Sequence, residues 1–486
     1  MTTDGDLHPD VLDLPAAGRV AIRGGIVRTV GYFVGTAVGI VSTIVLLRYL
    51  GAGDYGRYAT VISIAAVTGA LADAGVAVVS QRDFATLRGE AERRELQAHV
   101  AGLRIVLAPA AAVIAVTFAL VAGYDRTMVE GVAIGALGVL LVDLWQTALL
   151  PATTQLRFGI LTTAGLVRDV VTGLGLLGLV LAGATLLPFL AVPTIAALAV
   201  LVFALSVAGV SSIAPRFSWQ RWRPLLIDAL PLGIATVIGS VYLRLLLIIV
   251  SLATGRTDTG LYALSNRVLQ VLATGAAIAF SSAFPILARA SGDEDEERLA
   301  FALQQLFEVA VFLAVAGALI FAIAARPIAV LLGGSGYAGA ARALRIQAFA
   351  MFGTFLGLVW LPALVAVHRQ RARIAVSLCG LAMAAVAGGP LIVFFGITGA
   401  AVAAVLGEAT IAAAGLTALV RARPALRPKL GAAATLLACG AVSAWPAFVS
   451  AIPAGPAACL AVAMFVALAW FSGALPRDVV RAVLAR

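Results

Sequence analysis

The sequence has few charged residues and almost no lysine. Asp, Glu, Lys and Arg make up 12% of the 486 residues, whereas about a quarter of the residues of a soluble globular protein are charged. Hydrophobic residues make up 62%, the mean hydropathy is +1.05, and apolar runs long enough to span a membrane recur from residue 29 onward. A hydrocarbon core of about 30 Å needs a helix of roughly 20 such residues. The sequence therefore excludes a soluble fold and predicts an all-α polytopic membrane protein.

Cysteine and histidine are scarce, with three residues of each. The cysteines fall inside apolar segments without a CxxC or histidine spacing, so we expect packing residues rather than disulfides or metal ligands. The sequence contains neither a GxxxxGK(S/T) phosphate loop nor an HExxH zinc spacing. We therefore expect no metal, no cofactor and no ATP hydrolysis through such a loop.

The formal net charge of +10 comes from 33 arginines and one lysine. They are dispersed in short loops between apolar runs, which argues against a nucleic-acid partner and favours a role in membrane orientation. We predict fourteen spans, at about 29–49, 57–80, 99–122, 128–150, 159–182, 186–209, 225–253, 260–288, 301–325, 340–367, 374–395, 398–420, 430–450 and 455–475.

Loop charge sets the orientation of these spans. With the N-terminus inside, and with residues near span ends counted in the adjoining loop, 24 Lys and Arg residues fall in cytoplasmic segments, 7 in external segments and 3 deep within spans. This bias predicts a multi-pass membrane protein with both termini in the cytoplasm. Residues 1–18 hold four aspartates and no Lys or Arg, which indicates a cytoplasmic tail rather than a signal peptide.

A glycine-rich turn occurs twice, about 200 residues apart. The segments read LLRYLGAGDYGRYA at 46–59 and TGRTDTGLYA at 254–263, and they align at an offset of 204. The matching pairs are Gly51 and Gly255, Asp54 and Asp258, Gly56 and Gly260, Tyr58 and Tyr262, and Ala59 and Ala263. Both copies are predicted on the external side, where Gly56 and Gly260 would allow a tight turn or a close backbone approach. Chance similarity in a biased composition is the alternative.

If the turn marks a repeat, spans 1–6 and 7–12 form two bundles related by a pseudo-twofold axis along the membrane normal. Repeats of this kind are typical of transporters. The predicted organisation is a cytoplasmic tail (1–24), a six-helix bundle (25–210), a cytoplasmic linker (211–224), a second six-helix bundle (225–420), and two extra helices with a cytoplasmic C-terminus (421–486).

Three segments carry a resemblance to a known family. They are LLRYLGAGDYGRYATVISIAAVTGALADAGVAVVSQRDFA at 46–85, VLLGGSGYAGAARALRIQAFAMFGTFLGLVWLPALVAVHRQRAR at 330–373 and FGITGAAVAAVLGEAT at 395–410. Together they resemble polysaccharide and O-antigen flippases of the multidrug/oligosaccharidyl-lipid/polysaccharide exporter superfamily, over about residues 20 to 425.

The resemblance implies a V-shaped pair of six-helix bundles. Such a protein moves polyprenyl-diphosphate-linked oligosaccharides from the cytoplasmic to the outer leaflet by alternating access, for synthesis of the cell envelope. The implied partners are the lipid-linked glycan and membrane lipids, and could include a polysaccharide polymerase and glycosyltransferases.

Three arginines, Arg168, Arg244 and Arg267, lie deep within the predicted spans, at least seven residues from either end. Ionisable residues in spans usually face an interior or a cavity, and a guanidinium group suits phosphate oxygens. We expect these three to bind the diphosphate of a lipid-linked glycan. The polar groups of such a cargo need new hydrogen-bond partners when they lose water. Pairing with buried acids is the alternative.

Six acids also lie inside the predicted spans. Three are within about two turns of cytoplasmic ends, where water can reach them: Asp143, Asp228 and Glu308. Three are deeper and could balance the arginines or bind a coupling cation such as H⁺ or Na⁺, with structural pairing as the other reading: Asp73, Asp169 and Glu408. Adjacent residues on a helix do not face each other, so we expect Arg168 and Asp169 each to have another partner.

Other functions fit parts of the pattern. A cation-coupled multidrug extruder of the same superfamily predicts an acid-centred cavity and a closer match between halves. A membrane glycosyltransferase or ligase predicts a sizeable external loop with catalytic carboxylates, whereas the longest external segment, about 326–339, is apolar and glycine-rich. A scaffold without transport activity is a further reading. We expect a transporter rather than an enzyme.

Overall fold

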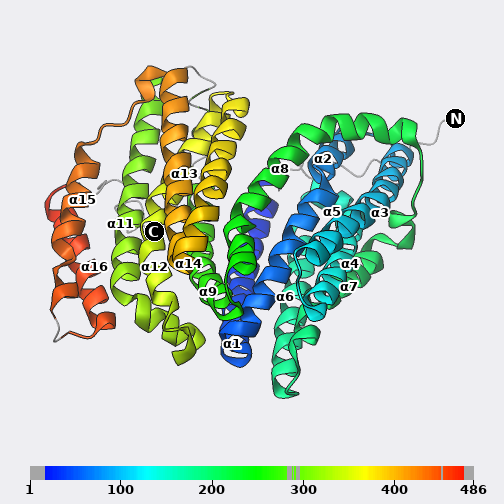
Figure 1. Cartoon of the computed structure of the whole chain (residues 1–486). Helices are drawn as coiled ribbons and strands as arrows, with labels where there is room; N and C mark the ends of the chain where they lie inside the picture. The colour runs from blue at the N-terminus through cyan, green and yellow to red at the C-terminus, as the bar shows by residue number, and fades with distance from the viewer. Residues whose placement is uncertain are drawn as a thin grey trace. The chain divides into compact units, whose positions relative to one another are not determined.

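The computed structural model of the chain describes residues 17–281, 287, 289, 291, 296–449 and 452–474. All regular structure in this part of the chain is helical (Figure 1), so the predicted all-α class is confirmed. Three predicted parts lie wholly or partly outside the described residues: the N-terminal tail at 1–16, the end of the span 260–288, and the C-terminus at 475–486.

Nine described helices are long and apolar enough to cross a membrane, or eleven if each of two bent helix pairs counts as one span. The chain is therefore a multi-pass membrane protein. The described helices do not confirm the count of fourteen, which stays a prediction, as does the pseudo-twofold relation.

The chain folds into two compact units. Unit 1 comprises the described residues up to Tyr49 together with Val61–Ser240, and unit 2 comprises Leu50–Thr60 together with the described residues from Val241 on. Unit 1 contains most of α1 (Ala17–Asp73), then α2 (Val76–Thr86), α3 (Glu90–Val121), α4 (Arg126–Ala148), α5 (Leu150–Thr154), α6 (Phe158–Leu181), α7 (Leu186–Ala208), η2 (Val210–Ile213) and the first part of α8 (Trp219–Ala253).

Unit 2 begins along the chain with the Leu50–Thr60 part of α1 and continues with the rest of α8. Its further elements are α9 (Arg256–Ser281), α11 (Glu296–Gly333), η3 (Ser335–Tyr337), α12 (Ala340–Gln347), α13 (Ala350–Ala366), α14 (Gln370–Ala422), η4 (Pro424–Leu426), α15 (Gly431–Ser443), η5 (Trp445–Phe448) and α16 (Ala454–Phe471).

Two long helices each contain two predicted spans. α1 breaks at Gly51 (φ 66°, ψ 177°), and α14 breaks at Gly396 (φ 58°, ψ −135°). Positive φ values are unfavourable for residues with a Cβ, so glycine lets the chain leave one helical segment and enter the next without a long loop. The first break lies in the first copy of the repeated turn, and the second separates the predicted spans 374–395 and 398–420.

In unit 1, α4 packs against α3 and α7. The helix begins after Asp125, whose carboxylate accepts a hydrogen bond from the backbone N–H of Met128 at 3.1 Å. An aspartate at this position satisfies one of the free N–H groups of a helix start. Further along α4, a Cβ added to Gly138 would stand 2.7 Å from Oγ1 of Thr194 on α7, so a small residue is needed for this close helix approach.

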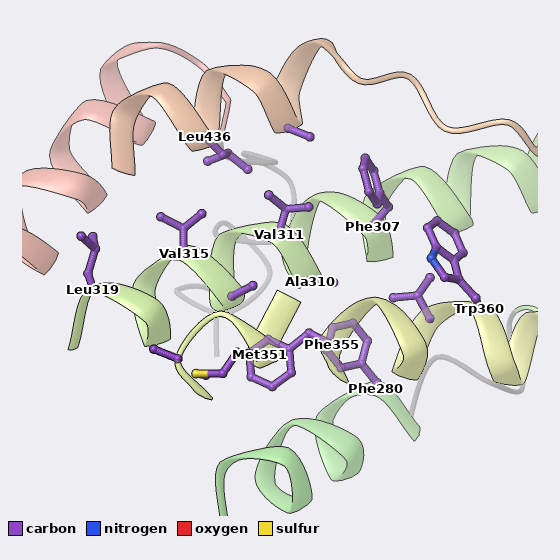
Figure 2. Packing of buried hydrophobic residues seen from close by; sticks show 14 of the residues in the cluster. Phe280, Phe307, Ala310, Val311, Val315, Leu319, Met351, Phe355, Trp360 and Leu436 are labelled. Atoms are coloured by element: carbon purple, nitrogen blue, oxygen red, sulfur yellow. The ribbon is translucent and has the colours of Figure 1, made fainter. Parts of the chain in front are cut away.

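The core of unit 2 is built around α11, which packs against α12, α13, α15 and α16 (Figure 2). The ring of Phe307 stacks on Trp360 with centroids 5.7 Å apart, and Phe312 stacks on Phe465 of α16 at 5.1 Å. Aromatic pairs of this kind add to the packing that holds membrane helices together. The predicted extra helices α15 and α16 are therefore part of the unit 2 core.

Candidate substrate site

The two copies of the repeated turn lie against each other in unit 2. A Cβ added to Gly56 would stand 2.6 Å from the backbone oxygen of Arg256 and 2.7 Å from the backbone nitrogen of Gly260. A Cβ added to Gly260 would overlap the backbone of Ala52. Real Cβ atoms essentially never come within 3.0 Å of another heavy atom, so both positions require glycine. The predicted close backbone approach is confirmed, and each copy approaches the other.

The aspartates of the two turns occupy similar places at helix starts. Asp54 follows the break at Gly51 and accepts a hydrogen bond from Nη1 of Arg57 at 3.0 Å. Asp258 lies in the first turn of α9 and is exposed. Carboxylates are favoured there because the N-terminal end of a helix carries a partial positive charge. Their part in transport stays a prediction.

Arg244 and Arg267 come together in unit 2 at similar depth. Arg244 lies nine residues before the end of α8 at Ala253, and Arg267 lies eleven residues after the start of α9 at Arg256. At 1.5 Å per residue these positions are about 14 Å and about 17 Å from the turn that joins the two helices. The two positive charges are near enough to interact. In a hydrocarbon core of about 30 Å the pair would lie about halfway across.

Neither arginine has an acidic partner in the described part of the chain. No hydrogen bond or ion pair joins Arg244 or Arg267 to another described residue. Arg244 is half-buried and Arg267 is exposed. Two like charges at this depth are unfavourable unless water or an anion meets them. The arrangement therefore suits an anionic ligand with more than one negative charge.

Three tyrosines gather near Arg267. Tyr55 and Tyr58 of α1 are both near enough to Arg267 to interact with its charge. The rings of Tyr55 and Tyr58 stack with centroids 6.2 Å apart, and Tyr337 of η3 meets Tyr55 edge-on at 6.4 Å. Neither Tyr55 nor Tyr337 was predicted as a site residue. The spacing of three between Tyr55 and Tyr58, which places both on one helix face, is the signal that could have identified the first.

Arg168 lies in unit 1 and is paired with its neighbour. Its Nε donates to Oδ1 of Asp169 at 3.0 Å, and the two side chains are 58% and 25% exposed. The expectation that each needs a different partner is wrong, because the long arginine side chain can curl back although adjacent Cβ atoms point apart. Asp169 also faces α1, since a Cβ added to Gly35 would overlap its carboxylate.

Asp73 has a buried basic partner, Arg104. From α3, Arg104 donates to Oδ1 of Asp73 at 3.3 Å, to Oγ1 of Thr147 at 3.0 Å and to the backbone oxygen of Asp143. Arg104 is 2% exposed. It was not predicted because it lies only about one and a half turns from the start of the span predicted at 99–122, where it could reach cytoplasmic water. Asp143 is 4% exposed, so the expectation that water reaches it is wrong.

Glu408 also has a specific partner. The hydroxyl of Tyr242 on α8 donates to Oε1 of Glu408 on α14 at 2.8 Å. A Cβ added to Gly353 of α13 would overlap the backbone of Glu408, so three helices meet at this acid. Among the described residues, no group of three or more His, Cys, Asp and Glu side chains could hold a metal ion.

Solved structures with the same fold are membrane transporters. The chain is similar to the lipid II flippase MurJ in an inward closed conformation, with a TM-score of 0.75 and 12% identity over 94% of this chain and 100% of that one. It is similar to an inward-facing multidrug resistance MATE family transporter of the MOP superfamily, with a TM-score of 0.66 and 14% identity over 82% and 98%. A third is a MOP superfamily transporter from Pyrococcus furiosus, described as having a binding pocket of reverse polarity, with a TM-score of 0.54 and 13% identity over 83% and 95%.

At these identities the structural likeness establishes the fold. No curated protein matches the chain. The family described as polysaccharide biosynthesis protein matches residues 21–291, which is more than half of the 486 residues. The resemblance seen in the sequence is confirmed, and the chain belongs to the polysaccharide biosynthesis protein family.

Proposed function

We propose that the chain is a flippase that moves a polyprenyl-diphosphate-linked oligosaccharide from the cytoplasmic to the outer leaflet by alternating access, for synthesis of a cell-surface polysaccharide. The observation that carries the proposal is the pair of Arg244 and Arg267, at similar distances from the turn that joins two successive helices and without an acidic partner among the described residues. The family and the fold shared with a lipid II flippase support it.

The chemistry of the cargo explains why a pair of arginines is suitable. A diphosphate that enters the membrane must exchange its water for other hydrogen-bond donors. Each guanidinium group offers a planar fork of donors, and a hydrogen bond to a charged group contributes about 1.5–3 kcal/mol. Beside Arg267, the partly exposed Tyr58 adds a neutral hydroxyl that can bind a sugar.

Arg168 enters the proposal as a further phosphate ligand, carried by unit 1. Its ion pair with Asp169 is largely exposed, and exposed pairs contribute only about 0–1 kcal/mol, so a phosphate could replace Asp169. Asp73 is proposed as the counter-charge of Arg104. Glu408, held by Tyr242, is proposed to balance charge or to bind a coupling cation in unit 2.

The proposal places the protein in a bacterial plasma membrane with both termini in the cytoplasm. The excess of arginine in the predicted cytoplasmic loops supports this orientation. The two bundles at 25–210 and 225–420 would alternate access to the cargo, and 421–486 would add two helices. A polysaccharide polymerase and glycosyltransferases are the proposed partners. Because translocation makes and breaks no covalent bond, the protein would not be an enzyme.

The fold shared with a multidrug resistance transporter favours a second candidate, cation-coupled drug extrusion. Extrusion of an organic cation would call for an acid-lined site. The pair of Arg244 and Arg267 would repel such a cation, whereas Glu408 already accepts a hydrogen bond from Tyr242. The arrangement therefore favours an anionic cargo.

Mass spectrometry of lipid extracts tests the proposed function. Cells depleted of the protein, and cells that carry only Arg244→Ala, should accumulate a polyprenyl-diphosphate glycan. Arg94→Ala is the control, because Arg94 lies in an exposed ion pair with Glu90 on α3, and its cells should resemble the wild type. Unchanged lipid intermediates after confirmed depletion would favour drug extrusion.

A further inference from the structure

Asp143 is a deeply buried acid whose carboxylate lacks a partner. The residue lies on α4, five residues before the end of the helix at Ala148, and is 4% exposed. Its Oδ2 atom is buried and has no hydrogen-bond partner in the described part of the chain. The neighbouring Arg104 donates a hydrogen bond to the backbone oxygen of Asp143. The carboxylate to which Arg104 donates is that of Asp73.

The charges around Asp143 do not balance if its carboxyl is ionised. Arg104 from α3 and Asp73 from α1 are the charged groups that act on it. The other elements packed on α4, namely α5, α7 and η2, contain no titratable residue. Arg104 supplies one positive charge, which Asp73 already matches. A second buried carboxylate would be uncompensated, which is strongly unfavourable, so a bound proton would restore neutrality.

A small polar hollow lies beside this network. It has a volume of about 10 Å³ and is lined by Ser80, Gln81, Gln146, Arg104 and Thr147 among others, but not by Asp143 itself. Arg104 and Thr147 both reach the backbone oxygen of Asp143. The volume of the hollow is about the least that a single water molecule needs, and the polar lining offers it hydrogen-bond partners.

The same network ends at a bend between two helices. Asp73 accepts hydrogen bonds from the backbone N–H groups of Gly75 at 3.2 Å and of Ala77 at 3.0 Å. The helices on either side, Val38–Asp73 and Val76–Thr86, are bent by 41°, with φ of 44° at Ala74 and 83° at Gly75. A change in how strongly Arg104 holds Asp73 would therefore act directly on this bend.

The bend is also in contact with α8. A Cβ added to Gly233 would overlap the backbone of Ala74, and one added to Gly75 would stand 2.6 Å from the nitrogen of Gly233. The residues of α8 from Val241 on belong to unit 2 and include Arg244. The bend thus contacts the helix that carries one of the proposed phosphate ligands.

We propose that Asp143 is a proton-binding site that couples proton movement to the bend between α1 and α2, and thereby, resting on the proposed function, to translocation of the cargo. When a proton leaves the Asp143 carboxyl, its O–H bond breaks and a single water molecule that enters from the hollow beside Arg104 and Thr147 accepts the proton. The carboxylate that remains competes with Asp73 for Arg104. This competition weakens the contact of Asp73 with the backbone N–H groups of Gly75 and Ala77 at the start of α2.

A proton fits this site better than a metal cation. The cluster holds two carboxyl groups, and among the described residues no set of three or more acidic, His or Cys side chains could bind a metal. The guanidinium group of Arg104 occupies the space between the two acids and would repel a cation such as Na⁺.

Infrared difference spectroscopy of the purified full-length protein tests the site without any cargo. The wild type should show the C=O band of a protonated carboxyl that disappears as the pH is raised, and Asp143→Asn should lack that band. Glu130→Gln is the matched control, because Glu130 lies on the same helix in an exposed pair with Arg126 at 2.7 Å, and it should keep the band. The same titrating band in Asp143→Asn, or a band that Na⁺ removes at constant pH, would overturn the proposal.

Transport in vesicles separates this proposal from the proposed function. For one coupled proton, a gradient of one pH unit can change the equilibrium ratio of cargo between the two leaflets by about tenfold. Translocation of the lipid-linked glycan by the wild type should respond to that gradient, while Asp143→Asn should bind the lipid but lose the response. An unchanged response in Asp143→Asn would overturn the coupling role. A titrating Asp143 band in a protein that binds no diphosphate lipid would instead contradict the proposed function alone.

Discussion

Gly56 and Gly260 pack backbone against backbone, so that neither position can accept a side chain. They are equivalent residues of the repeated turn, 204 positions apart in the sequence. The two copies of the turn contact each other, and each contributes a glycine at the point where the backbones come close. This contact joins the starts of the two helical segments that carry Tyr58 and Arg267.

The contact predicts that Gly260→Ala destabilises the protein. The added methyl group would overlap the backbone of Ala52, and overpacking of this kind costs about 1–3 kcal/mol. Gly255→Ala is the control in the same turn, since nothing lies within 4 Å of its added Cβ. Thermal unfolding in detergent should show a lower midpoint for Gly260→Ala only. Equal midpoints for the two variants would contradict the close approach.

Asp54 and Asp258 are predicted to affect transport more than folding. Asp54 is 46% exposed and Asp258 is exposed, so replacing either by asparagine leaves no buried group without a partner. Removing the charge would still change the electrostatics of the two repeated turns. Translocation rates should fall while protein abundance stays normal. Full activity at normal abundance in both variants would count against a functional role.

Arg104 is predicted to be essential for the stability of unit 1. Arg104→Met would leave the carboxylate of Asp73 without its basic partner, and breaking a buried pair costs about 3–5 kcal/mol. Arg94→Met on the same helix is the control, because its pair with Glu90 is exposed and should matter little. Chemical or thermal unfolding of both variants measures the difference. A wild-type stability for Arg104→Met would show that the network contributes nothing.

The hydrogen bond between Tyr242 and Glu408 is predicted to couple α8 to α14. Tyr242→Phe and Glu408→Gln should each destabilise unit 2, and the double variant should lose less than the sum of the two. Directly bonded residues show coupling energies of about 0.5–3 kcal/mol in such a cycle. Unfolding measurements on the wild type and the three variants give this energy. Strict additivity would mean that the 2.8 Å contact carries no coupling.

Much of the fold could be predicted from hydropathy and turn chemistry. The apolar runs became helices, and the glycine-rich segments at Gly51 and Gly396 became helix breaks because positive φ values favour glycine. Helix ends were harder to predict. α9 begins at Arg256 rather than at residue 260, so Arg267 lies about three turns from its start. The residues at 256–259 are polar and precede the apolar run, so hydropathy does not assign them to the helix.

The partners of the charged residues could not be predicted in the same way. Asp73 and Arg104 are 31 residues apart on different helices, so their pairing depends on how α1 and α3 pack. Asp143 lies near the end of a predicted span, which suggests that water can reach its carboxylate. In the fold, however, α3 and α7 pack on α4 and cover it. The pair of Arg168 and Asp169 depends on side-chain rotamers. Arg244 and Arg267 could be picked out because charges are rare in the spans, while their proximity follows from the hairpin of α8 and α9.

The most direct test of the account is a translocation assay in vesicles. Purified wild type and the double variant Arg244→Ala, Arg267→Ala would be reconstituted with a fluorescent polyprenyl-diphosphate oligosaccharide and exposed to a reductant that cannot cross the membrane. The account predicts that the reductant quenches nearly all of the fluorescence with the wild type, and only the outer-leaflet fraction with the double variant or with empty vesicles. Equal quenching by the wild type and the double variant would contradict a diphosphate site at Arg244 and Arg267, and quenching no greater than in empty vesicles would contradict the flippase itself.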